Sequence, residues 1–268
     1  MLAAAAPTRA EPPKRIVSLD LCADQLLIDL VPRSRIAAVT HLAADASVSA
    51  IPDKARGLPV THGSAEDVLS HDPDLILAGP WGVAGTVSLL QRLGRNVFIV
   101  PLAADLDGVR TAVTTVANAV GEPEAGARAI AEFDARLARA RDAQSRARPS
   151  ALIYQVGGSA SAPGTLADAA ISAAGFSNAA LSYASTRTGQ VPLEAIVARP
   201  PALLVLSSPP GAYRTVVADN LRHPALAQLV RTTASVTLPW RLWLCGTPHV
   251  ATAIEELAAA RTALKDAP

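Results

Sequence analysis

Aromatic residues are scarce in this 268-residue chain, which has only three tryptophans, three tyrosines and three phenylalanines. Neither sign of charge dominates, because 24 basic residues are balanced by 23 acidic ones and the net charge is +1. No basic stripe with interleaved aromatics occurs, so the sequence gives no support for nucleic-acid binding. One long uncharged run, residues 75–91, is interrupted by Gly79, Pro80 and Gly82. This pattern predicts a strand, a loop and a helix rather than a membrane span.

Motifs of common enzymes and metalloproteins are also missing. The chain has two cysteines, one in each half, and no CxxC pair or Cys/His cluster that would hold zinc. No nucleophile elbow, P-loop or dinucleotide-binding glycine motif follows a predicted strand. Two separated cysteines are too few for an iron–sulfur cluster. We therefore expect no catalytic residues, no metal centre and no cofactor.

What the sequence does contain is a repeated unit. The segment EDVLSHDPDLIL, which begins at Glu66, returns 128 residues later as EAIVARPPALLV, which begins at Glu194. In both copies a proline, Pro73 or Pro201, follows the glutamate by seven positions. Since the spacing is about half the chain, we expect two similar halves.

Each copy of the unit predicts a short helix, a break and a buried strand. Apolar residues two and three positions after the glutamate cover one face of the helix, and the proline ends it. The apolar runs at 75–78 and 203–206 are typical of parallel strands covered on both faces. A glutamate in the first helical turn is also stabilised by the helix dipole, so Glu66 and Glu194 have a purely structural explanation as well.

Strands and helices alternate along both halves, which predicts a parallel, doubly wound sheet in each. The predicted strands are 15–19, 36–39, 75–78, 97–100, 150–156, 203–206 and 236–238, and the predicted helices are 25–30, 83–93, 106–120, 124–148, 166–174 and 247–264.

The helix predicted at 124–148 has Ile130, Phe133 and Leu137 at helical spacing. At that length it would span roughly 37 Å, enough to join two lobes as a stiff strut; an ordinary surface helix is the alternative. The expected fold class is α/β, with two doubly wound parallel-sheet lobes joined by one long α-helix. The expected divisions are a leader at 1–13, an N-terminal lobe at 14–122, a connecting helix at 123–149 and a C-terminal lobe at 150–268.

The leader is short, apolar and rich in alanine. It is similar to the tail of a secretory signal peptide that lacks its basic region and full apolar core. We expect an exported, periplasmic protein whose signal peptide is truncated here; a disordered terminus is the alternative.

In their order along the chain, these features resemble the periplasmic substrate-binding proteins of ABC importers that take up vitamin B12 and iron–siderophore complexes. The resemblance covers about residues 15–264. It rests on the opening RIVSLD, the two glutamate units, the loop at Trp81, the long helix and the Trp-containing loop before residue 247. It implies two lobes with little hinge bending and no catalysis. It also implies that Glu66 and Glu194, one acid per lobe, dock onto arginines of the membrane permease, where separated ion pairs fix orientation and speed encounter.

Ligands of open α/β sheets bind beyond the carboxyl ends of the strands, and all three tryptophans fall on such loops. Tryptophan and tyrosine offer large rigid surfaces to a bulky ligand, and an arginine can pair with a ligand carboxylate or phosphate. The predicted ligand-binding residues are Asp20, Leu21, Cys22, Trp81, Gly158, Ser159, Tyr183, Arg187, Tyr213, Trp240, Arg241 and Trp243. Some have a structural alternative: any of the tryptophans can belong to a core, Trp243 above all, Asp20 can be a helix cap and Cys22 a small buried residue.

Few charged residues occur in these loops, which favours a corrinoid over a highly anionic siderophore. Among the five histidines, His71 and His223 do not look convergent, and there is no His-rich loop. This favours a chelated or organometallic ligand over a bare metal ion, for which His41, His62 and His249 would be the candidate ligands. We therefore expect a monomeric substrate-binding protein that carries a corrinoid (cobalamin-like) or ferric siderophore to an ABC permease in the inner membrane. The alternatives are a direct metal-ion or haem carrier of the same fold and a chelatase-like enzyme.

The two cysteines, Cys22 and Cys245, can form one disulfide in an oxidising compartment. A bridge between the lobes would lock a cleft that has to open. We therefore favour two unpaired cysteines, and a disulfide between them is the alternative.

Overall fold

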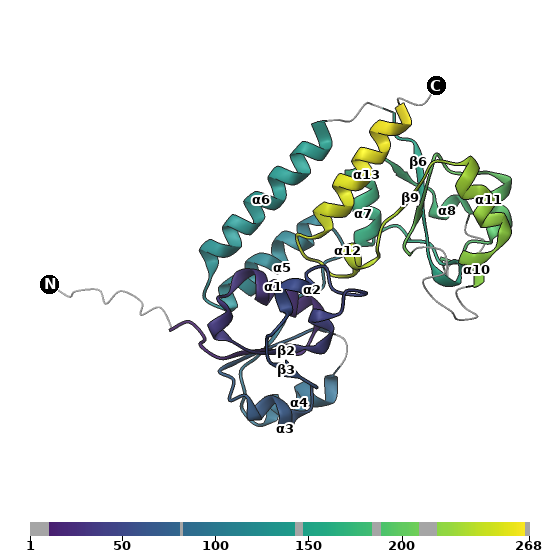
Figure 1. Ribbon diagram of the computed structural model, residues 1–268. Helices are drawn as coiled ribbons and strands as arrows, with labels where there is room; N and C mark the ends of the chain where they lie inside the picture. The colour runs from purple at the N-terminus through teal and green to yellow at the C-terminus, as the bar shows by residue number, and fades with distance from the viewer. Residues whose placement is uncertain (1–10, 81–82, 143–146, 184–188, 209–218, 266–268) are drawn as a thin grey trace.

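The computed structural model describes residues 11–80, 83–142, 147–183, 189–208 and 219–265. They form two α/β lobes, each built on an all-parallel sheet, and helix α6 (Pro123–Asp142) runs past both lobes (Figure 1). The predicted fold class is confirmed. Within the described ranges, no helix has both the length and the apolar character needed to cross a membrane.

The N-terminal lobe is a five-stranded sheet in the order β3-β2-β1-β4-β5. Its strands are β1 (Ile16–Ser18), β2 (Ile36–Thr40), β3 (Val60–Thr61), β4 (Leu75–Ala78) and β5 (Val97–Ile99). Its helical segments are α1 (Leu21–Leu30), η1 (Arg33–Arg35), η2 (His41–Ala44), α2 (Pro52–Ala55), α3 (Ala65–Ser70), α4 (Ala84–Arg92) and α5 (Leu106–Ala119).

The C-terminal lobe is a four-stranded sheet in the order β7-β6-β8-β9. Its strands are β6 (Ser150–Tyr154), β7 (Ser177–Asn178), β8 (Leu203–Leu206) and β9 (Ser235–Thr237). Its helical segments are η3 (Val156–Gly158), α7 (Leu166–Ala173), α8 (Ala180–Tyr183), α9 (Leu193–Ala198), α10 (Asp219–Arg222), α11 (Pro224–Thr232), α12 (Arg241–Leu244) and α13 (Val250–Lys265).

The two sheets repeat one strand order. The run β2-β1-β4-β5 of the first sheet corresponds to β7-β6-β8-β9 of the second, and β3 is an additional edge strand. The two copies of the glutamate unit occupy matching places, because each supplies a short helix, α3 or α9, and the strand beside the first strand of its lobe, β4 or β8. All four residues of each of these strands are buried, as expected for central strands of parallel sheets.

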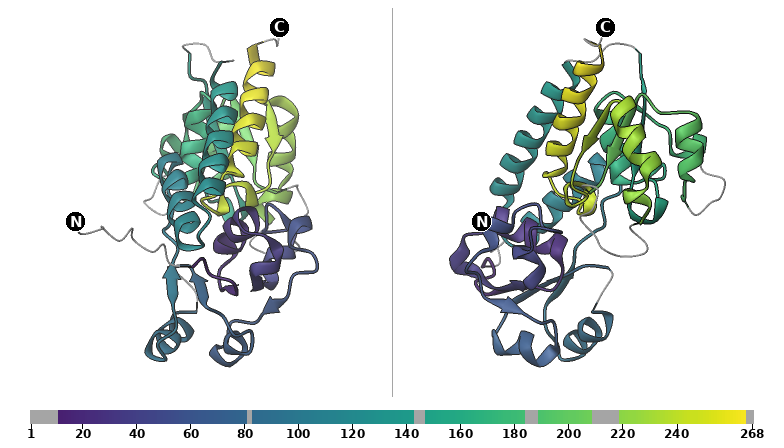
Figure 2. Two further views of the ribbon diagram at one scale, coloured as in Figure 1. Left: turned by 90° about the vertical axis from the view of Figure 1, so that its left-hand side faces the viewer. Right: turned by 45° about the vertical axis from the view of Figure 1, so that its right-hand side comes forward.

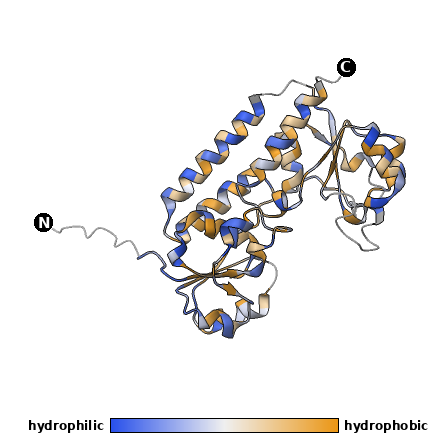
Figure 3. Cartoon of the chain, viewed as in Figure 1, coloured by the Kyte–Doolittle hydropathy of each residue, from blue (hydrophilic) through white to orange (hydrophobic). Residues whose placement is uncertain are grey.

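Helix α6 contributes to the cores of both lobes. Its first half, through Ala129 and Ile130, packs against the core of the N-terminal lobe. Its second half buries Phe133, Leu137 and Ala140 in the core of the C-terminal lobe. Figure 3 shows that α6 carries hydrophilic residues as well as these hydrophobic ones. The described helix ends at Asp142, six residues before the predicted end at 148.

Among the described residues, two ion pairs hold α6 to its neighbours. Arg110 on α5 pairs with Asp134, and Arg136 pairs with Glu255 on α13. Helices α6 and α13 lie side by side in both views of Figure 2. The long helix is therefore part of a helical layer, and it is not an isolated rod.

Candidate functional site

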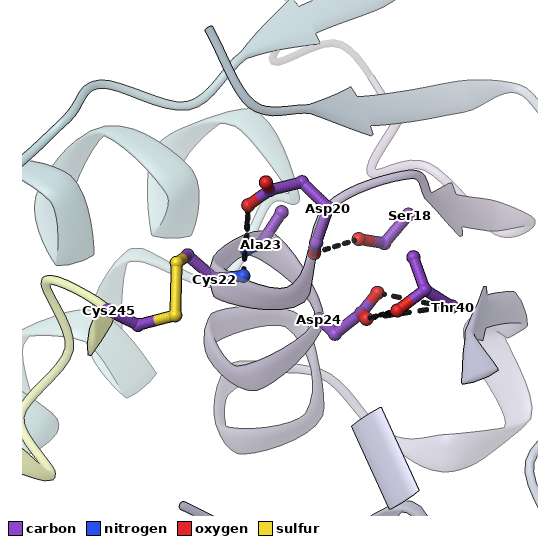
Figure 4. Close-up of a disulfide and its surroundings, with 7 residues drawn as sticks. All are labelled: Ser18, Asp20, Cys22, Ala23, Asp24, Thr40 and Cys245. Atoms are coloured by element: carbon purple, nitrogen blue, oxygen red, sulfur yellow. Dashed lines mark hydrogen bonds between the residues drawn. A yellow bond between two sulfur atoms is a disulfide. The ribbon is translucent and has the colours of Figure 1, made fainter. Parts of the chain in front are cut away.

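Segments that follow the carboxyl ends of β1 and β9, one strand from each sheet, meet at a disulfide. Helix α1 begins directly after β1, and α12 begins shortly after β9. Cys22 in the first turn of α1 forms a disulfide with Cys245, which follows α12, and their Cα atoms are 5.1 Å apart (Figure 4). Since the bond spans 223 residues of sequence, it brings together the strand ends at which both lobes are expected to bind a ligand.

The prediction of two unpaired cysteines is therefore wrong. It assumed that a bond between the lobes would bridge a space that must open. The bond instead lies where α1 already contacts the C-terminal lobe, because Asp29 on the same helix is hydrogen-bonded to His249. It reinforces an existing contact between the lobes.

Asp20 lies at this edge as the N-cap of α1. Its Oδ1 accepts hydrogen bonds from the backbone N–H groups of Cys22 at 2.9 Å and Ala23 at 3.1 Å. Its Oδ2 lies against Gly79, just beyond β4, where a Cβ would come within 2.5 Å of that oxygen. Only glycine fits such a close approach. Asp20 therefore caps α1 and packs closely against the residue that follows β4.

A buried carboxyl group lies beneath the same edge. Asp24 accepts a hydrogen bond from the Thr40 hydroxyl at 2.5 Å and from the Thr40 backbone N–H at 3.2 Å. Burial raises the pKa of Asp24 from 3.8 to about 7, although hydrogen bonds from Ser18 and Thr40 lower it in part, and the nearby charge of Asp20 adds to the rise. Asp24 thus exchanges a proton near neutral pH.

The segment around α12 provides polar contacts between the lobes. The Nε1–H group of Trp240 donates a hydrogen bond to the backbone carbonyl of Ser47 at 3.1 Å. Trp240 and Arg241 are both partly exposed, whereas Trp243 is buried in the core of the C-terminal lobe. Of the predicted residues in this loop, Trp240 thus lies between the lobes and Trp243 does not.

A second contact lies about two turns further along α1 than Cys22. His249 Nε2 donates a hydrogen bond to Asp29 Oδ2 at 2.6 Å, and Lys54 Nζ donates one to Asp29 Oδ1 at 2.7 Å. Burial on its own raises the pKa of Asp29, but the hydrogen bonds and charges of His249 and Lys54 outweigh it, and the net pKa is lowered. Asp29 is therefore a charged anchor at the lobe interface.

A hollow of about 480 Å³ opens at the carboxyl end of β6. Its lining combines one predicted ligand-binding residue, Gly158, with one predicted docking residue, Glu194. The other lining residues are Tyr154, Gly157, Gln190, Val191, Pro192, Leu193, Asn220 and His223. Ser159 is partly exposed next to Gly158. The structure therefore places the second glutamate at the rim of a hollow, which the sequence did not indicate.

The remaining predicted residues are not all in one place. Tyr183 is buried in a core of the C-terminal lobe, where its hydroxyl donates to the backbone carbonyl of Arg199 at 2.6 Å and the Arg199 guanidinium lies over its ring. Leu21 is buried beside Cys22. Trp81, Arg187 and Tyr213 lie outside the described residues.

Glu66 and Glu194 are both exposed, each in the first turn of its short helix. Neither forms an ion pair with another described residue. The residue that follows each glutamate differs between the lobes. Asp67 accepts hydrogen bonds from the Thr61 hydroxyl and the His62 backbone N–H, whereas Ala195 has no polar side chain. Each lobe thus presents one of these two acids to solvent.

Several residues that shape the site were not predicted from the sequence. Asn220 donates to the carbonyl of Gln155 at 3.0 Å and accepts from the N–H of Gly157 at 3.0 Å, and it thereby sets the floor of the hollow. A lone asparagine carries no sequence signal for this. Ser47 contributes only its backbone carbonyl, which no side-chain pattern reveals. Across the part of the chain that the structure covers, no group of three or more His, Cys, Asp or Glu could hold a metal ion.

Comparison with known proteins identifies relatives for both sequence and fold. A family model described as periplasmic binding protein matches residues 16–235. A cobalamin-binding protein, found in each of two strains of Halobacterium salinarum, is 30% identical over 197 residues, which are 72% of this chain and 53% of the relative. The chain thus spans about half the length of the curated relatives it matches.

Solved structures show the same fold. The apo periplasmic heme-binding protein RhuT from Roseiflexus sp. RS-1 has a TM-score of 0.73 at 22% identity and covers 94% of this chain and 98% of its own. The periplasmic vitamin B12 binding protein BtuF of Vibrio cholerae has a TM-score of 0.71 at 20% identity and covers 96% of this chain and 99% of its own. With a family model that matches most of its length, and with its two parallel-sheet lobes and connecting helix, the chain belongs to the periplasmic binding protein family.

Proposed function

We propose that this protein captures a corrinoid or a ferric siderophore between the carboxyl edges of its two sheets and delivers it to an ABC permease. One observation carries the proposal: the disulfide Cys22–Cys245 brings the two edges together, with Asp20, Trp240 and the hollow at Gly158 along them. The mechanism is binding and release. No residue is assigned a chemical step.

Three features make a corrinoid the preferred ligand. The curated relative at 30% identity is named a cobalamin-binding protein. Trp240 offers a broad, partly exposed ring at the edge, which suits a large and partly apolar macrocycle. The residues that line the hollow are mostly neutral, with Glu194 as the carboxylate among them, and a carboxylate disfavours a highly anionic siderophore.

The protein is proposed to work outside the cytoplasm as a monomer. A disulfide between its two cysteines supports an oxidising compartment such as the periplasm. The permease is proposed to meet Glu66 and Glu194, which are exposed, unpaired among the described residues and located one on each lobe.

Calorimetric and spectral titration tests the ligand assignment. Purified oxidised protein is titrated with cobalamin, cobinamide, haem and a ferric hydroxamate siderophore. We expect one corrinoid per chain, recovered chemically unchanged. Trp240→Phe should weaken the complex severalfold, while Asp53→Asn, an exposed change on α2, should leave it intact.

Other outcomes identify the rival functions. Binding of haem alone would assign a haem carrier, and zinc or manganese in the purified protein would assign a metal-ion carrier. Conversion of the ligand during the titration would assign a chelatase-like enzyme. No complex with any of the four probes would overturn the proposal.

A further inference from the structure

A ten-residue stretch of the C-terminal lobe, residues 240–249, is fastened to the N-terminal half at several points. Trp240 reaches Ser47, Cys245 is bonded to Cys22, and His249 is bonded to Asp29. Gly246 lies so close to Ala103, which precedes α5, that a Cβ would come within 2.3 Å of the alanine methyl carbon. We call the disulfide Cys22–Cys245 and the pair Asp29–His249 the α1 clasp, because both involve α1.

The α1 clasp uses one face of the helix. Cys22, Gln25 and Asp29 follow one another at helical spacing and therefore share a side of α1. Gln25 is fully buried, yet neither its Nε2 nor its Oε1 has a hydrogen-bond partner among the described residues. A buried unpaired amide costs about 1–3 kcal/mol. Gln25 therefore adds no hydrogen bond between the two ends of the clasp.

The α1 clasp adds a covalent connection to contacts that already join the lobes. Side chains of both α5 and α6 belong to the two cores. Helical contacts of this kind allow small sliding and rotation of packed elements. The disulfide restricts this sliding and rotation, because it adds a covalent link between the lobes at a point separate from the packed helices.

We propose that the α1 clasp is a redox-sensitive lock on the spacing between the two carboxyl edges. Cys22 is partly exposed and Cys245 is buried, so a dithiol reductant attacks the Cys22 sulfur. Cys245 leaves as a thiolate and takes up a proton. The second thiol of the reductant then releases Cys22, and the reductant is oxidised to its own disulfide. The two electrons from the dithiol thus reduce the disulfide Cys22–Cys245. Without it, the lobes remain joined by the continuous chain through α6 and by non-covalent contacts.

Distance measurements between the lobes test this lock without any ligand, so the result does not depend on the proposed function. Spin labels are attached through p-acetylphenylalanine at exposed Gln91 and at exposed Ala227, which avoids the cysteines. The oxidised protein should give one narrow distance distribution. After treatment with a dithiol, with two free thiols verified by mass spectrometry, the distribution should widen roughly twofold. An unchanged distribution in the reduced protein would overturn the proposal.

Two controls separate the bond from its surroundings. In the Cys22→Ser/Cys245→Ser variant the distribution should already be wide and should not respond to the dithiol. In Asp29→Asn the disulfide remains, and the distribution should stay narrow. If Asp29→Asn broadens it as much as reduction does, the ion pair rather than the disulfide sets the spacing, and the proposal fails. Hydrogen exchange of residues 21–30 in the reduced wild type gives a second measurement should the variant not fold, and unchanged protection there would equally contradict the lock.

Discussion

Arg136 on α6 and Glu255 on α13 form an ion pair with two hydrogen bonds. Arg136 Nε donates to Oε1 at 2.9 Å, and Nη2 donates to Oε2. Nη2 also donates to the Thr252 hydroxyl at 2.9 Å. Because the planar guanidinium matches the carboxylate at two points, this pair fixes the angle between the helices better than a single contact would.

We expect Glu255→Gln to lower the free energy of unfolding by about 1 kcal/mol, the upper range for a partly exposed pair. Arg136→Lys should have a similar effect, because a lysine keeps the charge and loses the two-point geometry. Urea denaturation measures both. Glu256→Gln, at the exposed neighbouring position, is the matched control. If the double variant loses the full sum of the two single effects, the residues are not coupled and the interpretation is wrong.

Asp24 should make stability fall as pH rises. Its pKa is raised to about 7 in the folded protein against 3.8 in an ordinary environment, so the folded state binds the extra proton between these values. The stability that this proton contributes is complete below pH 3.8 and is lost progressively up to about pH 7. Each unit of pKa difference corresponds to roughly 1.4 kcal/mol.

The Asp24→Asn variant cannot ionise, and its stability should decline less over this pH range than that of the wild type. Urea denaturation at a series of pH values measures the two slopes. Asp53→Asn removes an exposed carboxylate and should keep the wild-type slope. Equal slopes in Asp24→Asn and wild type would show that Asp24 does not hold the proton.

The disulfide should contribute strongly to stability as well as to geometry. Its loop is long, and closing a long loop in the unfolded chain stabilises the folded state by typically 2–4 kcal/mol. We expect Cys22→Ser/Cys245→Ser to lose about that amount in urea denaturation. Reductant should destabilise the wild type equally and leave the variant unchanged. A reductant effect on the variant would mean that the loss does not come from this bond.

Glu66 and Glu194 should matter for transport more than for binding. Replacing both by alanine should strongly impair uptake in a reconstituted importer, because two separated ion pairs orient the protein on its permease. Corrinoid affinity, measured by calorimetry on the isolated protein, should stay within about twofold. Asp72→Asn provides a control near Glu66 that keeps both acids.

The single variants distinguish the two glutamates. Glu194 lines the hollow at the carboxyl end of β6, and Glu66 does not. A large loss of affinity in Glu194→Ala alone would show that this acid belongs to the ligand site, and its docking role would then need to be abandoned.

Much of the fold follows from local patterns in the sequence. The apolar runs that became β4 and β8 are continuous because both faces of those strands are covered, and this pattern is visible without a structure. The shared position of Phe133 and Leu137 on one helix face was equally visible. Short elements were missed: β7 has two residues and α10 has four, which is too few for any periodicity to appear.

The candidate site was harder to predict, because its geometry depends on contacts distant in sequence. The pairing of Cys22 with Cys245 and of Asp29 with His249 joins positions more than 200 residues apart. Tyr183 and Trp243 carry the residue types expected of a ligand site, yet both are buried. A position after a strand predicts where the backbone of a residue lies. The packing of the whole lobe then determines whether its side chain faces the core or the ligand.

Because α6 contributes side chains to the cores of both lobes, it affects how the chain unfolds on heating. A single helix of twenty residues supplies one wall to each hydrophobic interior, so neither half can lose its order while the other keeps a closed interior. A polypeptide cut at residue 122 or at residue 149 would leave one fragment with an uncovered apolar surface. Heating the intact chain should accordingly produce one cooperative calorimetric transition instead of two, as in a single folding unit.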